Sequence, residues 1–129
     1  MVKYITPQEL EALIKSKSSD YLVVDVRGDD YRGGNIKGGI NIPSEKFLLK
    51  LHQLIDDTQT VSKIIFHCAL SQQRGPKAAR IYTEARLLQE GVTDIEYEVF
   101  VLKGGFSDFQ QLFRHDPKLV ENWDKRAWD

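Results

Sequence analysis

The sequence predicts a three-layer α/β domain whose central sheet is mostly parallel, and three observations lead to this fold class. The run at residues 21–26 leaves little polar alternation, which suits a strand covered on both faces. Further strand-like runs occur at residues 63–67 and 96–102. Between the runs, apolar residues recur at helical spacing, and strands that alternate with helices form sheets flanked by helices. At 129 residues, the chain is expected to form a single domain over residues 1–129.

The first elements follow from capping and turn residues. Thr6 and Glu9 have the Thr-x-x-Glu form of a capping box with a proline between them, so a helix should begin there. After the strand at 21–26, residues 27–39 hold five glycines and several charges and are expected to form a loop. Residues 40–43 should form a short strand that a proline ends.

The next helix is expected to start with Ser44 as its cap. Its predicted buried stripe consists of Phe47, Leu48, Leu51, Leu54 and Ile55. After the strand at 63–67, Pro76 should open a further helix. The apolar face of that helix should consist of Ala78, Ile81, Ala85 and Leu88.

The C-terminal part begins with the strand at 96–102, which Gly104 and Gly105 break. Ser107 is expected to cap a short helix that runs to Phe113. The tail from His115 onward carries Trp123 and Trp128 and could wrap the domain surface, while its charged run at residues 118–129 is interpreted as a solvated face.

Composition excludes several function classes. Eighteen basic and nineteen acidic residues give a net charge of −1, so neither a nucleic-acid partner nor a membrane surface is indicated. No apolar run reaches the roughly 20 residues of a membrane span. We find no signal or transit peptide, and one cysteine excludes an internal disulfide framework. A cytoplasmic or nuclear location is therefore expected.

The most informative segment lies between the strand at 63–67 and the helix after it. Cys68 and Arg74 are separated by five residues at the carboxyl end of a strand, where open α/β sheets bind ligands. Successive backbone N–H groups in this stretch can turn onto one tetrahedral oxyanion. The intervening residues, expected to bind the oxyanion together with Arg74, are Ala69, Leu70, Ser71, Gln72 and Gln73.

The chemistry expected here is nucleophilic displacement by Cys68. The helix N-terminus and Arg74 should lower the thiol pKa and favour the reactive thiolate. The planar guanidinium can hold two oxygens of a phosphate-like group. Phosphate would form a cysteinyl-phosphate that water cleaves, whereas arsenate would form a thio-arsenate that an external thiol reduces.

Supporting roles are expected for three residues around this loop. His67 should orient the loop by hydrogen bonds, with direct catalysis as the alternative, and Asp25 and Arg27 should tie the strand end to the neighbouring loop. Carboxylates in a loop, such as those of Asp29 and Asp30, are usually solvated, although one of these two could act as a general acid from outside the Cys68–Arg74 loop. Because His67 and Cys68 are adjacent in the chain, they are poorly placed to bind one metal ion together, so no metal site is predicted.

The sequence leaves the roles of three side chains near the loop open. Ser71 could donate to the sulfur, assist leaving-group transfer or cap the loop backbone. Tyr31 and Phe106 could border the pocket, although aromatic residues more often belong to the core.

Four motifs in order resemble the rhodanese-fold cysteine phosphatases, a group that includes the cell-cycle dual-specificity phosphatases and the eukaryotic arsenate reductases. Residues 24–27 resemble the Asp-x-Arg strand end of rhodanese domains. Residues 34–43 are similar to their Gly-His-Ile segment, with Asn35 in place of the histidine. The Cys-x5-Arg-Gly-Pro loop and the Gly-Gly-aromatic turn at 102–106 complete the series, and the loop looks most like that of small fungal and plant members.

The resemblance implies a rhodanese-like domain with cysteine-dependent phosphatase activity of the tyrosine or dual-specificity type. Alternatively, the resemblance implies arsenate reduction with glutathione and glutaredoxin as external reductants. No bound cofactor is expected in either case. Gln73 departs from the cell-cycle phosphatases, which carry a glutamate there that is proposed to protonate the leaving group. The implied ligands are phosphate, arsenate or a sulfate-like oxyanion, with a phosphoprotein as a further candidate substrate.

Two other functions remain open alternatives. A Cys68 persulfide would support sulfur transfer, but sulfurtransferases of this fold usually have one residue fewer between cysteine and arginine. A non-catalytic oxyanion or phosphopeptide binder would not need both Cys68 and Arg74. The sequence leaves the physiological substrate and the oligomeric state open.

Overall fold

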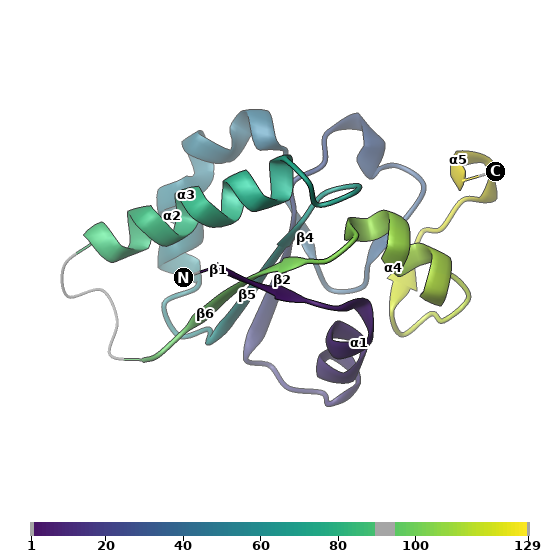
Figure 1. Cartoon of the computed structure of the whole chain (residues 1–129), viewed down its shortest axis with the longest axis horizontal. Helices are drawn as coiled ribbons and strands as arrows, with labels where there is room; N and C mark the ends of the chain where they lie inside the picture. The colour runs from purple at the N-terminus through teal and green to yellow at the C-terminus, as the bar shows by residue number, and fades with distance from the viewer. Residues whose placement is uncertain (1, 90–94, 129) are drawn as a thin grey trace.

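A five-stranded parallel sheet forms the centre of the molecule, with strand order β1-β6-β5-β2-β4 (Figure 1). The computed structural model describes residues 2–89 and 95–128. The five strands are β1 (Val2–Ile5), β2 (Tyr21–Asp25), β4 (Ile40–Asn41), β5 (Lys63–His67) and β6 (Glu98–Leu102). The prediction of an α/β fold with a mostly parallel sheet is confirmed.

Helices cover both faces of this sheet. They are α1 (Pro7–Lys15), α2 (Phe47–Asp57), α3 (Arg74–Leu88) and α4 (Gly105–Phe113), while the short α5 (Lys125–Trp128) lies beyond the end of the sheet near the C-terminus (Figure 1). Figure 1 shows α2 and α3 on one face and α1 and α4 on the other. Neighbouring strand residues point to opposite faces, so Val24 and Phe66 join the core under α2 and α3, whereas Val23 and Ile65 join the second core under α1 and α4.

The predicted capping box at the start of α1 is confirmed. The Thr6 hydroxyl oxygen accepts from the Glu9 amide at 3.1 Å, and the Glu9 carboxylate accepts from the Thr6 amide at 2.9 Å. These two bonds satisfy amides that the first turn of a helix leaves free. Local chemistry thus decides where this helix begins.

Two predicted helix caps are wrong. Ser44 lies in a 3-10 turn, Ser44–Lys46, and α2 begins after that turn without a side-chain cap. Ser107 lies inside α4, whose N-cap is Gly104. Gly104 and Gly105 both have positive φ, 78° and 62°, so the chain turns sharply and enters the helix two residues before the serine.

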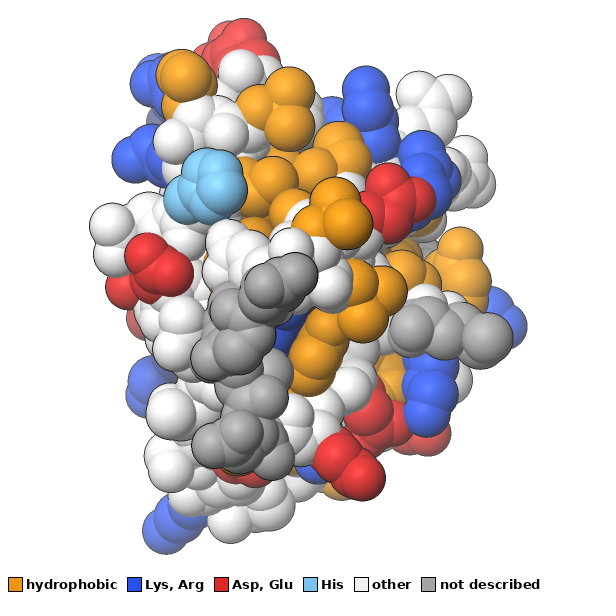
Figure 2. All heavy atoms as spheres, turned by 90° about the vertical axis from the view of Figure 1, so that its left-hand side faces the viewer, with side chains coloured by type: hydrophobic (Ala, Val, Ile, Leu, Met, Phe, Trp, Pro, Cys, Tyr) orange, Lys and Arg blue, Asp and Glu red, His pale blue; other side chains and the backbone are white. Residues whose placement is uncertain are grey.

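The predicted apolar faces of α2 and α3 are correct except at one leucine each. Leu48 is 70% exposed and Leu88 is 83% exposed. Figure 2 looks onto the end of the molecule where α3 terminates and shows hydrophobic side chains gathered on that surface. The buried face of α3 instead includes Arg86, which donates to the Tyr82 hydroxyl at 2.9 Å and lies 3.6 Å above the Tyr97 ring. An arginine paired in this way can be buried, which an apolar pattern does not reveal.

The tail after α4 packs against the domain, so its interpretation as a solvated face is wrong for several residues. β7 (Val120–Glu121) pairs antiparallel with β3 (Asn35–Ile36), a strand within the predicted loop at 27–39. Leu119 and Val120 are buried in the core under α1 and α4, and Trp123 packs against it. Asp129, at the end of the predicted charged run, lies outside the described residues.

No helix within residues 2–89 and 95–128 is long and apolar enough to cross a membrane.

Candidate active site

The loop between β5 and α3 places the cysteine sulfur at the base of a hollow. Cys68 follows directly after β5 and is 3% exposed. The Gly75 amide, in the first turn of α3, donates to Sγ at 3.3 Å. The Cys68 amide donates to the Ser71 hydroxyl oxygen at 3.4 Å, so Ser71 takes the backbone-capping role, one of the three considered from sequence. Its φ of 56° lets the chain turn back within a few residues.

The rest of the loop lines this hollow of about 290 Å³. Its lining residues are Cys68, Ala69, Leu70, Gln72, Gln73 and Arg74. The amides of residues 69–73 have no hydrogen-bond partner among the described residues. Unpaired amides in a tight loop next to a helix N-terminus can bind the oxygens of an anion. Cys68, Arg74 and a loop whose amides have no partner among the described residues thus adjoin one small volume.

Arg74 is paired with Asp30, a residue from the loop after β2. Nη1 and Nη2 of Arg74 donate to the two carboxylate oxygens of Asp30 at 3.0 and 2.7 Å. These hydrogen bonds raise the pKa of Arg74 and lower the pKa of Asp30. The sequence alone treats Asp29 and Asp30 alike, and the structure places only Asp30 against the arginine.

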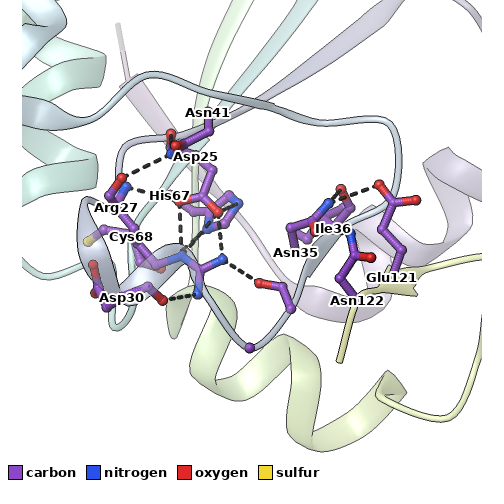
Figure 3. Close-up of polar contacts among 12 residues, drawn as sticks. Asp25, Arg27, Asp30, Asn35, Ile36, Asn41, His67, Cys68, Glu121 and Asn122 are labelled. Carbon is purple, nitrogen blue, oxygen red and sulfur yellow. Dashed lines mark hydrogen bonds and ion pairs between the residues drawn. The ribbon is translucent and has the colours of Figure 1, made fainter. Parts of the chain in front are cut away.

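A buried ion pair fixes the loop that carries Asp30 (Figure 3). Arg27 is fully buried, and its guanidinium donates to the Asp25 carboxylate with a shortest distance of 2.7 Å. The same guanidinium donates to the backbone oxygens of Asp30 at 3.0 Å and Gly34 at 2.8 Å and lies 4.4 Å above the Phe106 ring. Arg27 thereby holds the end of β2 and the Asp30 loop together, and Phe106 belongs to the core.

His67 lies beneath the loop and does not line the hollow. It is completely buried and stacks on Phe106 with 6.3 Å between ring centroids. Its Nδ1 is 3.3 Å from the carbonyl oxygen of Cys68, and its Nε2 is 3.7 Å from Asp25 and has no hydrogen-bond partner. Burial lowers the pKa of His67 below its ordinary value, against the attraction of Asp25. A neutral imidazole that contacts the loop backbone fits a supporting role.

The N-terminus of α4 supports the loop from behind. The Phe106 amide donates to the Cys68 oxygen and the Ser107 amide to the Ala69 oxygen, both at 2.9 Å. Gly105 makes this approach possible, because a Cβ there would lie 2.4 Å from the Ala69 oxygen and 2.6 Å from the Cys68 oxygen. The Gly-Gly-aromatic turn therefore holds the Cys68 loop in position through backbone hydrogen bonds.

Gly105→Ala should destabilise the protein more than Gly38→Ala does. Both glycines have positive φ, 62° and 80°, but a Cβ at Gly38 would meet nothing within 4 Å. Gly38→Ala should cost only the left-handed backbone penalty of about 1–2 kcal/mol. Gly105→Ala should cost about 1–3 kcal/mol more, because its methyl group meets backbone atoms. Urea unfolding of both variants measures the difference, and equal losses would show that the loop carbonyls yield freely.

The C-terminal tail holds the loop that bears Asp30, a specific contact that the sequence did not predict. The Gly33 oxygen accepts from the Asp124 amide at 3.0 Å and from Trp128 Nε1 at 2.9 Å. Asn35, at the position of the family histidine, donates to the Glu121 carboxylate at 2.9 Å (Figure 3). Two tryptophans in a polar tail were the available signal, because a large indole ring is rarely left in solvent without a partner.

Known proteins resemble this chain in sequence and in fold. A model of the rhodanese-like domain matches residues 6–112. The dual specificity phosphatase ibp1 of Schizosaccharomyces pombe is 31% identical over 135 residues, which cover 93% of this chain and 96% of that protein. The structure of Ygr203w, described as a yeast protein tyrosine phosphatase of the rhodanese family, is 31% identical with a TM-score of 0.84 and covers 99% of this chain and 97% of that chain. An As-Sb reductase from Leishmania major is 29% identical with a TM-score of 0.74 and covers 93% of this chain and 85% of that chain.

Proposed function

Because this chain belongs to the rhodanese family, and because enzymes are among its relatives, we propose that it is a cysteine-dependent phosphatase of the tyrosine or dual-specificity type. One observation carries this proposal. Cys68 and Arg74 line one hollow together with loop residues whose amides have no partner among the described residues, and Arg74 has two guanidinium donors there. A phosphate monoester has the charge and the oxygen geometry that such a hollow can bind.

The proposed reaction has two displacement steps. The loop amides and Arg74 hold the phosphate oxygens, and the Cys68 thiolate attacks phosphorus. A sulfur–phosphorus bond forms as the bond to the leaving oxygen breaks. Water then attacks phosphorus, and sulfur leaves as the thiolate with release of inorganic phosphate. The Gly75 amide and the N-terminus of α3 stabilise negative charge on the sulfur at the start and the end of this cycle.

Arsenate reduction is the second candidate, supported by the As-Sb reductase relative and by the single cysteine. Cys68 would displace water from arsenate and form a sulfur–arsenic(V) bond. An external thiol would attack that sulfur and form a mixed disulfide, while the bonding electron pair reduces arsenic(V) to arsenic(III). A second thiol would then restore Cys68 and release the external disulfide. A chain with one cysteine needs both thiols from outside, which glutathione and glutaredoxin can supply.

The setting proposed for this enzyme is the cytoplasm or the nucleus, where thiols stay reduced. Its proposed substrates are phosphoproteins or small oxyanions. Residues 1–129 are proposed to act as one domain, since β7 and Trp128 of the tail contact the loop that carries Asp30.

The test is hydrolysis of p-nitrophenyl phosphate by the full chain. We expect release of p-nitrophenol that vanadate and arsenate inhibit competitively. Because Cys68 is the only cysteine, alkylation with iodoacetate is a specific control and should remove the activity. Arsenic(III) formation from arsenate with added glutathione and glutaredoxin is measured in parallel. Activity that survives alkylation, or no release above buffer, would contradict the phosphatase proposal.

A further inference from the structure

We infer that Asp30 is the general acid of this site, and that the incoming oxyanion releases it from Arg74. This inference rests on the proposed function. The bidentate pair of Asp30 and Arg74 carries it, because the carboxylate occupies the same two guanidinium donors that a phosphate group would use. A planar carboxylate and one edge of a tetrahedral oxyanion present equivalent pairs of oxygens to this fork. The two anions therefore compete for Arg74.

The backbone of Asp30 stays in place when its side chain is displaced. Arg27 donates to the Asp30 carbonyl oxygen at 3.0 Å, and Arg27 is itself fixed by the buried Asp25. Asp30 lies in a 3-10 turn, Asp29–Tyr31, whose Tyr31 amide donates to the Gly28 oxygen at 3.0 Å. An oxyanion at Arg74 would thus displace only the carboxyl group, which remains at the rim of the hollow.

The loop itself lacks an acid. None of the residues that line the hollow carries a carboxyl group, and Gln73 has no proton of suitable acidity. A second carboxyl group on this side of the molecule belongs to Glu45, which lines a hollow of about 400 Å³ together with Arg74. Glu45 makes no hydrogen bond to Arg74 among the described residues, so it is the natural rival in the test.

Displacement changes the protonation of Asp30 in the direction that catalysis needs. Hydrogen bonds from Arg74 are the main cause that lowers the pKa of Asp30, while partial burial raises it. A substrate that takes over Arg74 removes the first cause and adds a nearby negative charge, so the pKa of Asp30 rises and a larger fraction of the carboxyl group is protonated. As the bond between phosphorus and the leaving oxygen breaks, Asp30 gives that proton to the oxygen. In the second step the Asp30 carboxylate accepts a proton from the attacking water.

The experiment compares two aryl phosphates in single turnover. Phenyl phosphate has a leaving oxygen that needs a proton, whereas p-nitrophenyl phosphate needs far less help. Asp30→Asn should slow release of phenol about 100-fold and release of p-nitrophenol less than about 10-fold. Asp29→Asn and Glu45→Gln are matched controls and should change both rates by less than about twofold. Asp29 is exposed in the same turn and takes no part in the Arg74 pair.

Binding of inorganic tungstate, measured by calorimetry, gives a readout that does not depend on turnover. Tungstate should bind Asp30→Asn several-fold more tightly than the wild type, because a competing carboxylate is gone. Equal slowing of both substrates, or weaker tungstate binding, would show that Asp30 is only structural and overturn the inference. A leaving-group effect of Glu45→Gln would assign the acid to Glu45 and overturn it as well. An inactive wild type would instead contradict the proposed function, so the two failures are distinguishable.

Discussion

Replacement of Cys68 by serine should abolish hydrolysis of aryl phosphates, with a fall in kcat on the order of 10⁴-fold or more. A serine hydroxyl in this position remains protonated near neutral pH and is a poor nucleophile. No other cysteine exists in the chain that could take over its role. The measurement is kcat for p-nitrophenyl phosphate with the wild type and the variant under identical conditions. A residual rate above about 1% would mean that the nucleophile lies elsewhere.

The same variant should still bind the oxyanion. Arg74 and the amides of residues 69–73 are unchanged, and a hydroxyl can accept the hydrogen bond that the Gly75 amide now gives to Sγ at 3.3 Å. Tungstate should bind Cys68→Ser at least as tightly as the wild type, because a neutral hydroxyl does not repel a dianion. Loss of binding together with activity would indicate a collapsed loop rather than a missing nucleophile.

Removal of the buried carboxylate by Asp25→Ala should lower the free energy of unfolding by about 3–5 kcal/mol. Arg27 is fully buried, and Asp25 accepts hydrogen bonds from its backbone amide, Nε and Nη2. Without Asp25 the guanidinium charge stays buried without its counterion. Since whole domains have stabilities of only about 5–15 kcal/mol, this loss is large. Urea unfolding at neutral pH measures it.

The matched control for this prediction is an ion pair at the surface. Arg126 pairs with Asp124 at 3.0 Å, and the Arg126 side chain is 91% exposed. Arg126→Ala should cost less than about 1 kcal/mol, because water solvates the remaining charge and the Asp124 carboxylate can still accept from the backbone amide of residue 126. Similar losses of stability in the two variants would show that burial does not make the Asp25 pair more costly to break.

The sequence predicted best those features that depend on residues close together in the chain. The five-residue spacing between Cys68 and Arg74 predicted a loop between a strand and a helix, and the structure has such a loop between β5 and α3. The capping box of α1 is equally local, since its two hydrogen bonds join residues three positions apart. Spacing within a few residues determines such features, because the backbone links their atoms directly.

Local rules failed where distant contacts decide. Ser44 and Ser107 have the side chains of helix caps, but neither caps a helix. Ser44 lies in a 3-10 turn before α2, and α4 begins before Ser107 because its first amides donate to the carbonyl oxygens of the Cys68 loop. Leu48, at the start of α2, and Leu88, at the end of α3, fit an apolar face by spacing, but both are exposed among the residues that the structure describes. Residues that continue a periodic pattern are buried only where another surface meets them.

Sequence by itself determined the fold class, the loop from Cys68 to Arg74 and the chemistry that a thiolate and a guanidinium can perform together. Only the tertiary structure selected Asp30 over Asp29 as the partner of Arg74, 44 positions away in the chain. It also brought Gly105 against the loop carbonyls and the tail against Gly33. The physical reason is that hydrogen bonds and ion pairs act over a few ångströms in space, and the folded path alone decides which distant residues come within that distance.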